Sequence, residues 1–166
     1  MESPEKIISL TGFMGAGKSS VGKELARRLG WSFVDLDDEV VLLDGRSIPA
    51  IFSESGEDAF RQLEIKALEK VLKMPRGPIV LALGGGTICL DKAREMILAG
   101  THCIFLNASD AEILGRVGPD TSSRPVFNLA RMQERLPYYR QAHHEISTDG
   151  KSVQQVVDEI LERQIV

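Results

Sequence analysis

The chain has 166 residues, of which 43% are hydrophobic and 27% are charged, and its formal net charge is −4. This length suits one compact domain, and the composition excludes an intrinsically disordered chain. The acidic balance also argues against general nucleic-acid binding, which usually needs a basic surplus.

Apolar runs alternate with helical patterns along the whole chain. In chain order, the expected strands are residues 6–10, 31–36, 78–83, 102–107 and 145–147. The expected helices are one that carries Val21, Leu25 and Leu29 and ends at Gly30, followed by residues 39–43, 48–53, 57–73, 91–99, 111–117, 131–144 and 153–165. Strands separated by helices imply right-handed crossovers and a parallel sheet. The sequence therefore predicts an α/β fold, with a central five-stranded parallel sheet flanked by helices, in a single domain over residues 1–166.

The N-terminus, the lengths of the apolar runs and the cysteine content of the chain indicate the cellular compartment. Its N-terminus, MESPEK, is polar, and no apolar run approaches membrane-spanning length. The two cysteines, Cys89 and Cys103, are too few for a disulfide framework and are expected to be buried, reduced thiols. We expect a cytoplasmic monomer with no membrane or nucleic-acid partner.

The strongest motif is GFMGAGKS at residues 12–19, directly after the first apolar run. It fits G-x-x-x-x-G-K-[ST] at every fixed position, between an expected strand and an expected helix. In such a loop the backbone N–H groups surround phosphate oxygens, the lysine reaches the β- and γ-phosphates, and the serine hydroxyl serves Mg²⁺. The expected ATP-binding residues here are Gly15, Ala16, Gly17, Lys18, Ser19 and Ser20. The motif predicts a nucleotide site with Mg²⁺ as cofactor.

Acidic residues follow the second expected strand in the sequence DLDD. Ligands of an open parallel sheet bind at the carboxyl ends of strands, and alternate residues there face the same side. Asp35 and Asp37 can therefore face one pocket, where one carboxylate supports Mg²⁺ and the other accepts a hydroxyl proton. The alternative is that Asp37 or Asp38 caps the helix that follows.

Two further features have weaker signals when each is taken alone. Arg61 lies four residues after Glu57, so a solvated pair on one helix face is an alternative to a ligand contact. The triple glycine at residues 84–86 ends a strand and removes every side chain, as expected where a ligand touches the backbone.

A basic segment follows the fourth expected strand. Five arginines lie between Arg116 and Arg140, against only Asp120 and Glu134, which suggests small anionic ligands. Residues 118–128 have loop chemistry, and the expected mobile lid spans about residues 117–130. Arginines in a lid can clamp developing phosphoryl charge and exclude water.

As a set, these residues resemble the shikimate kinase family, which has the P-loop fold of small nucleoside-monophosphate-kinase-like enzymes. The resemblance covers almost the whole chain. Its motifs are GFMGAGKS, the D-x-D of residues 35–37, GRS-I at 45–48, F-R-x-x-E at 60–64, GGG at 84–86, RP at 124–125 and R-x-P-x-Y at 135–139. The implied fold has three layers and a mobile lid. The implied activity is transfer of the γ-phosphoryl group of ATP to the 3-hydroxyl of shikimate, in chorismate and aromatic amino acid biosynthesis.

The resemblance also implies residue roles. Ser19 and Asp35 would serve the metal, and Lys18, Asp37 and Arg124 would form the catalytic set. The residues placed around shikimate are Asp37, Phe52, Phe60, Arg61, Gly84, Gly85, Gly86 and Arg135. The residues added to the ATP site are Arg116, Arg124 and Lys151, with Arg116 and Lys151 near the adenine. Arg131 and Arg140 remain competitors for the role of Arg135.

Two alternative functions remain at this point. One is another small-molecule kinase of the same fold, such as a gluconate-type or nucleotide kinase. The other is a degenerate module that binds a nucleotide without catalysis. Such modules usually lose the loop lysine, the acceptor aspartate or the lid arginine, whereas Lys18, Asp37 and Arg124 are all present.

Overall fold

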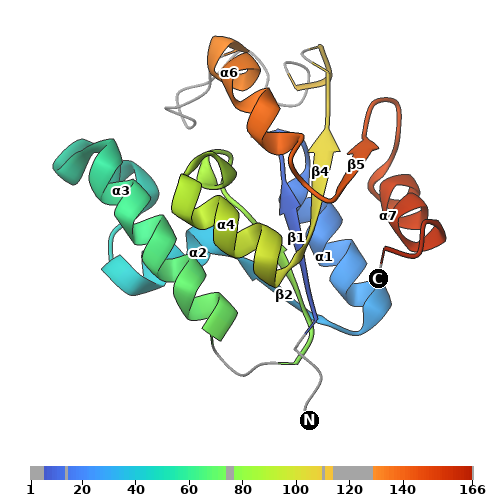
Figure 1. Cartoon of the computed structure of the whole chain (residues 1–166), viewed down its shortest axis with the longest axis horizontal. Helices are drawn as coiled ribbons and strands as arrows, with labels where there is room; N and C mark the ends of the chain where they lie inside the picture. The colour runs from blue at the N-terminus through green and yellow to red at the C-terminus, as the bar shows by residue number, and fades with distance from the viewer. Residues whose placement is uncertain (1–5, 14, 74–76, 110, 114–128, 166) are drawn as a thin grey trace.

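The computed structural model describes residues 6–13, 15–73, 77–109, 111–113 and 129–165. Within them, one parallel sheet has the strand order β2-β3-β1-β4-β5 (Figure 1). The strands are β1 (Ile7–Thr11), β2 (Ser32–Asp35), β3 (Ile79–Ala82), β4 (His102–Asn107) and β5 (His144–Ser147). The expected five-stranded parallel sheet is confirmed.

Helices cover both faces of this sheet. They are α1 (Lys18–Leu29), α2 (Leu36–Asp44), α3 (Ile48–Lys73), α4 (Asp91–Gly100), α6 (Leu129–Tyr139) and α7 (Val153–Glu162), with a 3₁₀ turn η1 (Thr87–Cys89). Successive side chains of a strand point to opposite faces. Ser9 of β1 is hydrogen-bonded to Thr101 at the end of α4, whereas Leu10 reaches Gly22 of α1. Thus α1 and α4 lie on opposite faces, which gives three layers.

The strands are short apolar runs because the sheet is covered on both sides. Every residue of β1 and β3 is buried, as expected for parallel strands between helical layers. Cys103 on β4 is buried, and this burial raises the pKa of its thiol to about 11. Cys89 is only partly buried, so the expectation of two buried thiols is wrong for this residue.

Two helix boundaries differ from the sequence prediction, at the start of α2 and at the end of α6. Helix α2 begins at Leu36 rather than at residue 39, because the Asp35 carboxylate caps it by accepting from the Asp37 N–H. The expected helices 48–53 and 57–73 both lie within α3, whose interruption at Gly56 (φ 87°) agrees with the expected break between them. The expected helix 131–144 is too long: α6 ends at Tyr139, and β5 begins at His144.

Among the described helices, none is long and apolar enough to span a membrane. Helix α6 lies at the end of the sheet where the strands finish, above α4 and β4 in Figure 1. Most of the expected helix 111–117 and most of the expected lid at 117–130 fall outside the described residues.

Candidate active site

The phosphate loop connects β1 to α1 through glycines in the left-handed region. Gly12, Gly15 and Gly17 have φ values of 147°, 86° and 91°. A Cβ on Gly12 would stand 2.7 Å from the Leu106 carbonyl oxygen, so both its conformation and its space require glycine. Gly17 caps α1 without a side-chain hydrogen bond, which leaves the positive end of the helix directed into the loop. The Lys18 ammonium donates to the Gly12 carbonyl and so lies across this loop.

Asp35 connects the phosphate loop to the end of β2. One of its oxygens accepts from the Ser19 hydroxyl at 3.0 Å, and the other accepts from the Asp37 N–H at 2.9 Å. Asp35 is therefore the cap of α2, and the alternative in which Asp37 or Asp38 has this role is wrong.

The Ser19 and Asp35 oxygens fit a magnesium ion that also binds ATP. Mg²⁺ prefers hard oxygen ligands, and in such sites it is held by one or two protein groups plus the phosphates. Within the described part of the chain, no three His, Cys, Asp or Glu side chains gather closely enough to hold a metal. The Ser19 hydroxyl and the Asp35 carboxylate therefore suit a metal ion that is also coordinated by a nucleotide better than one that is coordinated by protein side chains alone.

Asp37 lies between the phosphate loop and the triple glycine. One of its carboxylate oxygens is 3.4 Å from the position that a Cβ would take on Gly84. The pKa of Asp37 is raised to about 6, chiefly by burial and then by the negative charges of Asp35 and Glu64, while the positive charge of Lys18 opposes the rise. A carboxyl group with this pKa suits proton transfer near neutral pH.

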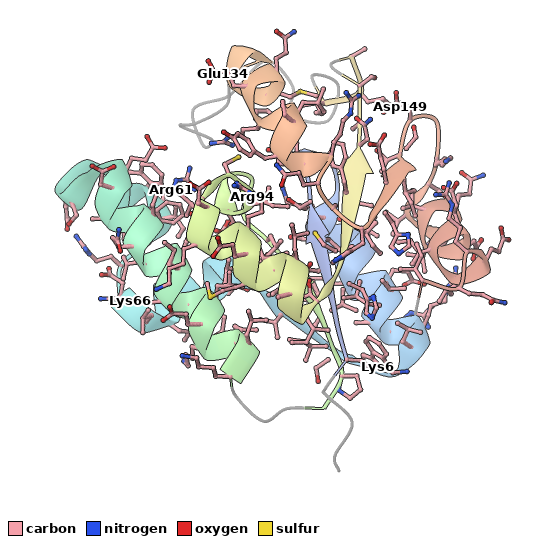
Figure 2. All side chains as sticks on the ribbon, in the orientation of Figure 1. Lys6, Arg61, Lys66, Arg94, Glu134 and Asp149 are labelled. Carbon is pink, nitrogen blue, oxygen red and sulfur yellow. The ribbon has the colours of Figure 1, made fainter. Side chains whose placement is uncertain are left out.

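The partly buried Arg61 and the buried Glu64 form a charged pair on α3. The guanidinium donates to Glu64 at 2.6 Å and to Glu57 at 3.3 Å. The Glu64 side chain is fully buried, and its second oxygen accepts from the Thr87 hydroxyl at 2.8 Å. The solvated pair with Glu57 exists, but the stronger bond joins Arg61 to the inner cluster. Figure 2 places Arg61 on α3 on the side that faces α4.

The triple glycine allows close packing against this cluster. A Cβ on Gly84 would be 2.7 Å from a Glu64 oxygen, and one on Gly86 would be 2.6 Å from an Arg61 nitrogen. Even alanine would therefore displace the charged side chains. The rings of Phe52 and Phe60 pack against each other with their centres 4.7 Å apart, and their contact with the substrate ring stays a prediction.

Arg135 and Arg140 are the two candidate arginines whose side chains are described, and of these Arg135 is directed inward. It is 7% exposed, and its guanidinium lies 5.9 Å from the ring centre of Phe13 in the phosphate loop. Arg140 is exposed and lies 3.9 Å from Glu145. Arg131 belongs to α6, but its side chain is outside the described set.

Comparison with known proteins identifies the family. The family model described as shikimate kinase matches residues 14–164. The chain belongs to the shikimate kinase family. It is 39% identical to the shikimate kinase of Thermus thermophilus, over 96% of this chain and 90% of that protein. It is 38% identical to that of Salinibacter ruber, over 93% of this chain and 82% of that protein.

Solved structures agree with this assignment. A shikimate kinase from Acinetobacter baumannii, in complex with shikimate, superposes with a TM-score of 0.89 at 33% identity, covering 97% of this chain and 93% of that one. The shikimate kinase of Aquifex aeolicus gives a TM-score of 0.81 at 32% identity, covering 95% of each chain. The P-loop kinase fold is thereby confirmed.

In this shikimate kinase family member, the expected site residue Lys151 lies outside the described cluster. The Lys151 ammonium donates to the Ser147 carbonyl and to Glu159, both at 2.9 Å, on the β5–α7 side of the molecule. Its contact with adenine stays a prediction. Arg116 and Arg124 lie outside the described residues.

Sequence reasoning gave no role to Glu64, Thr87 or Tyr139, although all three are buried next to expected site residues. For Glu64 a signal existed, because it lies one helical turn after Arg61. For Tyr139 the R-x-P-x-Y motif was a signal, although it did not indicate the partner. For Thr87 none existed, because its partner Glu64 lies 23 positions away in the sequence.

Proposed function

We propose that this chain catalyses the reaction of its family at the described site: the γ-phosphoryl group of ATP passes to the 3-hydroxyl of shikimate, giving shikimate 3-phosphate and ADP. The position of Asp37 carries this proposal. A partly buried carboxylate lies between the phosphate loop and the glycine turn, which packs against Arg61.

On the phosphate side, Lys18 and the loop N–H groups hold the β- and γ-phosphates, with Gly15, Ala16, Gly17, Ser19 and Ser20 around them. Mg²⁺, held by Ser19 and Asp35, would neutralise phosphate charge when bound. Lys18 meets the charge that develops on the transferred group. Arg116, Arg124 and Lys151 complete this ATP site.

On the acceptor side, Asp37 accepts the proton of the shikimate hydroxyl as its oxygen bonds to the γ-phosphorus. The bond from the γ-phosphorus to the bridging oxygen breaks, and that oxygen leaves with ADP. Phosphoryl transfer is loose, so Asp37 contributes orientation as well as basicity. Arg61, Arg135 and the triple glycine bind the other hydroxyls and the carboxylate, while Phe52 and Phe60 flank the ring.

A coupled assay of ADP release tests the proposal with shikimate, gluconate and AMP as acceptors in parallel. We expect Mg²⁺-dependent turnover with shikimate and at least 100-fold lower kcat/KM with the other two, as a site built for hydroxyl and carboxylate contacts implies. Faster turnover with gluconate or AMP would favour the other small-molecule kinases. ATP binding without turnover of any acceptor would favour the degenerate module.

We further propose that the enzyme works as a cytoplasmic monomer formed by one domain over residues 1–166. The length and the single sheet of the described residues support one domain. Light scattering after gel filtration would report the mass, and a dimer mass would contradict the monomer.

A further inference from the structure

The triple-glycine turn is held through its carbonyl groups. The Gly84 carbonyl accepts from the Thr87 N–H at 3.2 Å, and the Gly86 carbonyl accepts from the Cys89 N–H at 3.1 Å. Both bonds are local to the turn. The Gly85 carbonyl accepts from the phenol of Tyr139 at 2.6 Å, across 54 positions of sequence.

The amide groups of the same turn have a different environment. Among the described residues, none accepts a hydrogen bond from the N–H of Gly84, Gly85 or Gly86. In a trans peptide the N–H points away from the C=O. A donor that fixes the Gly85 carbonyl therefore also fixes the direction of the next N–H, that of Gly86. The Cβ side of Gly86 packs against Arg61.

The side chain of Tyr139 is fixed in place by burial and by ring stacking. Its side chain is 1% exposed, and its ring stacks on Phe105 of β4 with 5.2 Å between ring centres. Burial raises the pKa of the phenol well above its usual value, so the group remains a neutral donor. Tyr139 also lies one helical turn after Arg135, so α6 carries both the inward arginine and the anchor of the glycine turn.

We propose that Tyr139 is a positioning residue for the acceptor substrate. It fixes the Gly85–Gly86 peptide so that the turn presents its N–H groups to hydroxyl oxygens, and it holds this turn in register with Arg135. This inference rests on the proposed function, because it assumes that the turn and Arg135 bind the phosphoryl acceptor. It assigns Tyr139 no contact with substrate.

The test is Tyr139→Phe, which removes one oxygen atom and leaves the ring to stack on Phe105. We expect KM for shikimate to rise about fivefold to tenfold, the size expected for one hydrogen bond. KM for ATP should stay within twofold of the wild type, since the phosphate loop keeps its contacts. A general loosening of the fold would raise both constants.

The neighbouring residue provides a matched control. Tyr138 is 37% exposed, and its ring lies 5.0 Å from the Arg94 guanidinium, so Tyr138→Phe should leave both KM values unchanged. Phe105→Leu keeps the Tyr139 phenol but removes its stacking partner. It should lower the melting temperature and raise KM for shikimate less than Tyr139→Phe does. An unchanged shikimate KM in Tyr139→Phe, or equal rises for both substrates, would overturn the inference.

A second measurement covers the case in which Tyr139→Phe does not fold. In wild-type enzyme with isotope-labelled tyrosine, shikimate should slow exchange of the Tyr139 hydroxyl proton more than ADP does. Equal effects of the two ligands would overturn the inference. Wild-type turnover tests the proposed function separately: an inactive wild type overturns both proposals, whereas an active wild type beside an unaffected Tyr139→Phe overturns only this one.

Discussion

At the scale of single residues, the ionised carboxylate of Asp37 is expected to destabilise the folded protein at neutral pH. Burial and the neighbouring carboxylates raise its pKa to about 6, from a usual value of 3.8. The unfolded chain therefore ionises this group at lower pH than the folded chain does. The protonated Asp37 carboxyl therefore adds to the free energy of unfolding below about pH 4, and this contribution is lost as the pH rises through about 6.

We therefore predict that Asp37→Asn gives an inactive but more stable protein at neutral pH. Without nucleotide and with metal chelated, its free energy of unfolding at pH 7.5 should exceed that of the wild type by roughly 1–2 kcal/mol. The gain should shrink as pH is lowered toward 5, because the wild-type carboxyl then becomes neutral in the folded state. Urea denaturation at several pH values measures it.

The matched control is Asp38→Asn, because Asp38 is exposed on the same helix. It should change neither stability nor activity by much. A stabilised Asp38→Asn beside an unchanged Asp37→Asn would mean that the pocket faces the other aspartate.

Arg135 is the second residue for which we predict a specific effect on substrate binding. A guanidinium can grip a carboxylate with two parallel hydrogen bonds, which an ammonium cannot reproduce. Arg135→Lys should raise KM for shikimate at least tenfold, as the loss of roughly 1.5–3 kcal/mol for a charged hydrogen bond implies. Steady-state kinetics with ATP varied separately should show little change in KM for ATP.

Arg140→Lys is the control, since Arg140 is exposed and lies beside Glu145. Shikimamide, in which an amide replaces the carboxylate, should be a much poorer substrate than shikimate for wild type and only slightly poorer for Arg135→Lys. If Arg140→Lys or Arg131→Lys gave the large effect, the carboxylate site would lie on another turn of this segment.

At the scale of elements, the close contact of α1 with β2 rests on Gly22. A Cβ on this residue would stand 2.6 Å from the Phe33 ring and 3.4 Å from Leu10. Gly22→Ala should therefore lower the free energy of unfolding by about 1–3 kcal/mol, although alanine is the better helix former. Thermal melts followed by circular dichroism would measure it.

Gly100 at the end of α4 is the matched glycine. The atom nearest to a Cβ added at Gly100 would be a Leu72 methyl carbon at 3.9 Å, and the φ of Gly100 is not in the left-handed region. Gly100→Ala should leave stability unchanged or raise it by about 0.5–1 kcal/mol. A stable Gly22→Ala would mean that Phe33 can move aside at little cost.

The sequence predicted the elements better than their ends. Strand β4 was expected with the bounds that the structure has, His102–Asn107, because a buried parallel strand is a continuous apolar run. The start of α2 was missed because a cap was considered only at Asp37 or Asp38, whereas Asp35 caps the helix and also contacts Ser19. The end of α6 was missed because the helical pattern continues past Tyr139 into residues that instead turn toward β5.

At the scale of the whole molecule, the sequence indicated which residues form the candidate site but not how they are joined. The phosphate loop, the aspartates and the triple glycine are each recognisable because their spacing is local. The bond from Thr87 to Glu64 and that from Tyr139 to Gly85 join segments 23 and 54 positions apart. No local pattern contains such a pairing, because it depends on the strand order that brings these segments to one end of the sheet.

That strand order also predicts how the molecule unfolds. Strand β1 pairs with β3 and β4, β3 pairs with β2, and β4 pairs with β5, so losing a central strand separates the sheet. The core residues of both helical layers form one continuous cluster. We therefore expect one cooperative transition, as in most single domains of this size.

Two probes can test this expectation. The chain has one tryptophan, Trp31, which packs against the core between α1 and β2. Its fluorescence reports on one edge of the sheet, whereas far-ultraviolet circular dichroism averages over every helix, including α6 and α7. The two urea midpoints should coincide, and saturating shikimate should shift both by the same amount, because a ligand that binds only the folded chain stabilises it as a unit. If the midpoints separated, or if shikimate moved only the dichroism curve, the region around α6 would fold independently of the α1–β2 edge and residues 1–166 would not be one domain.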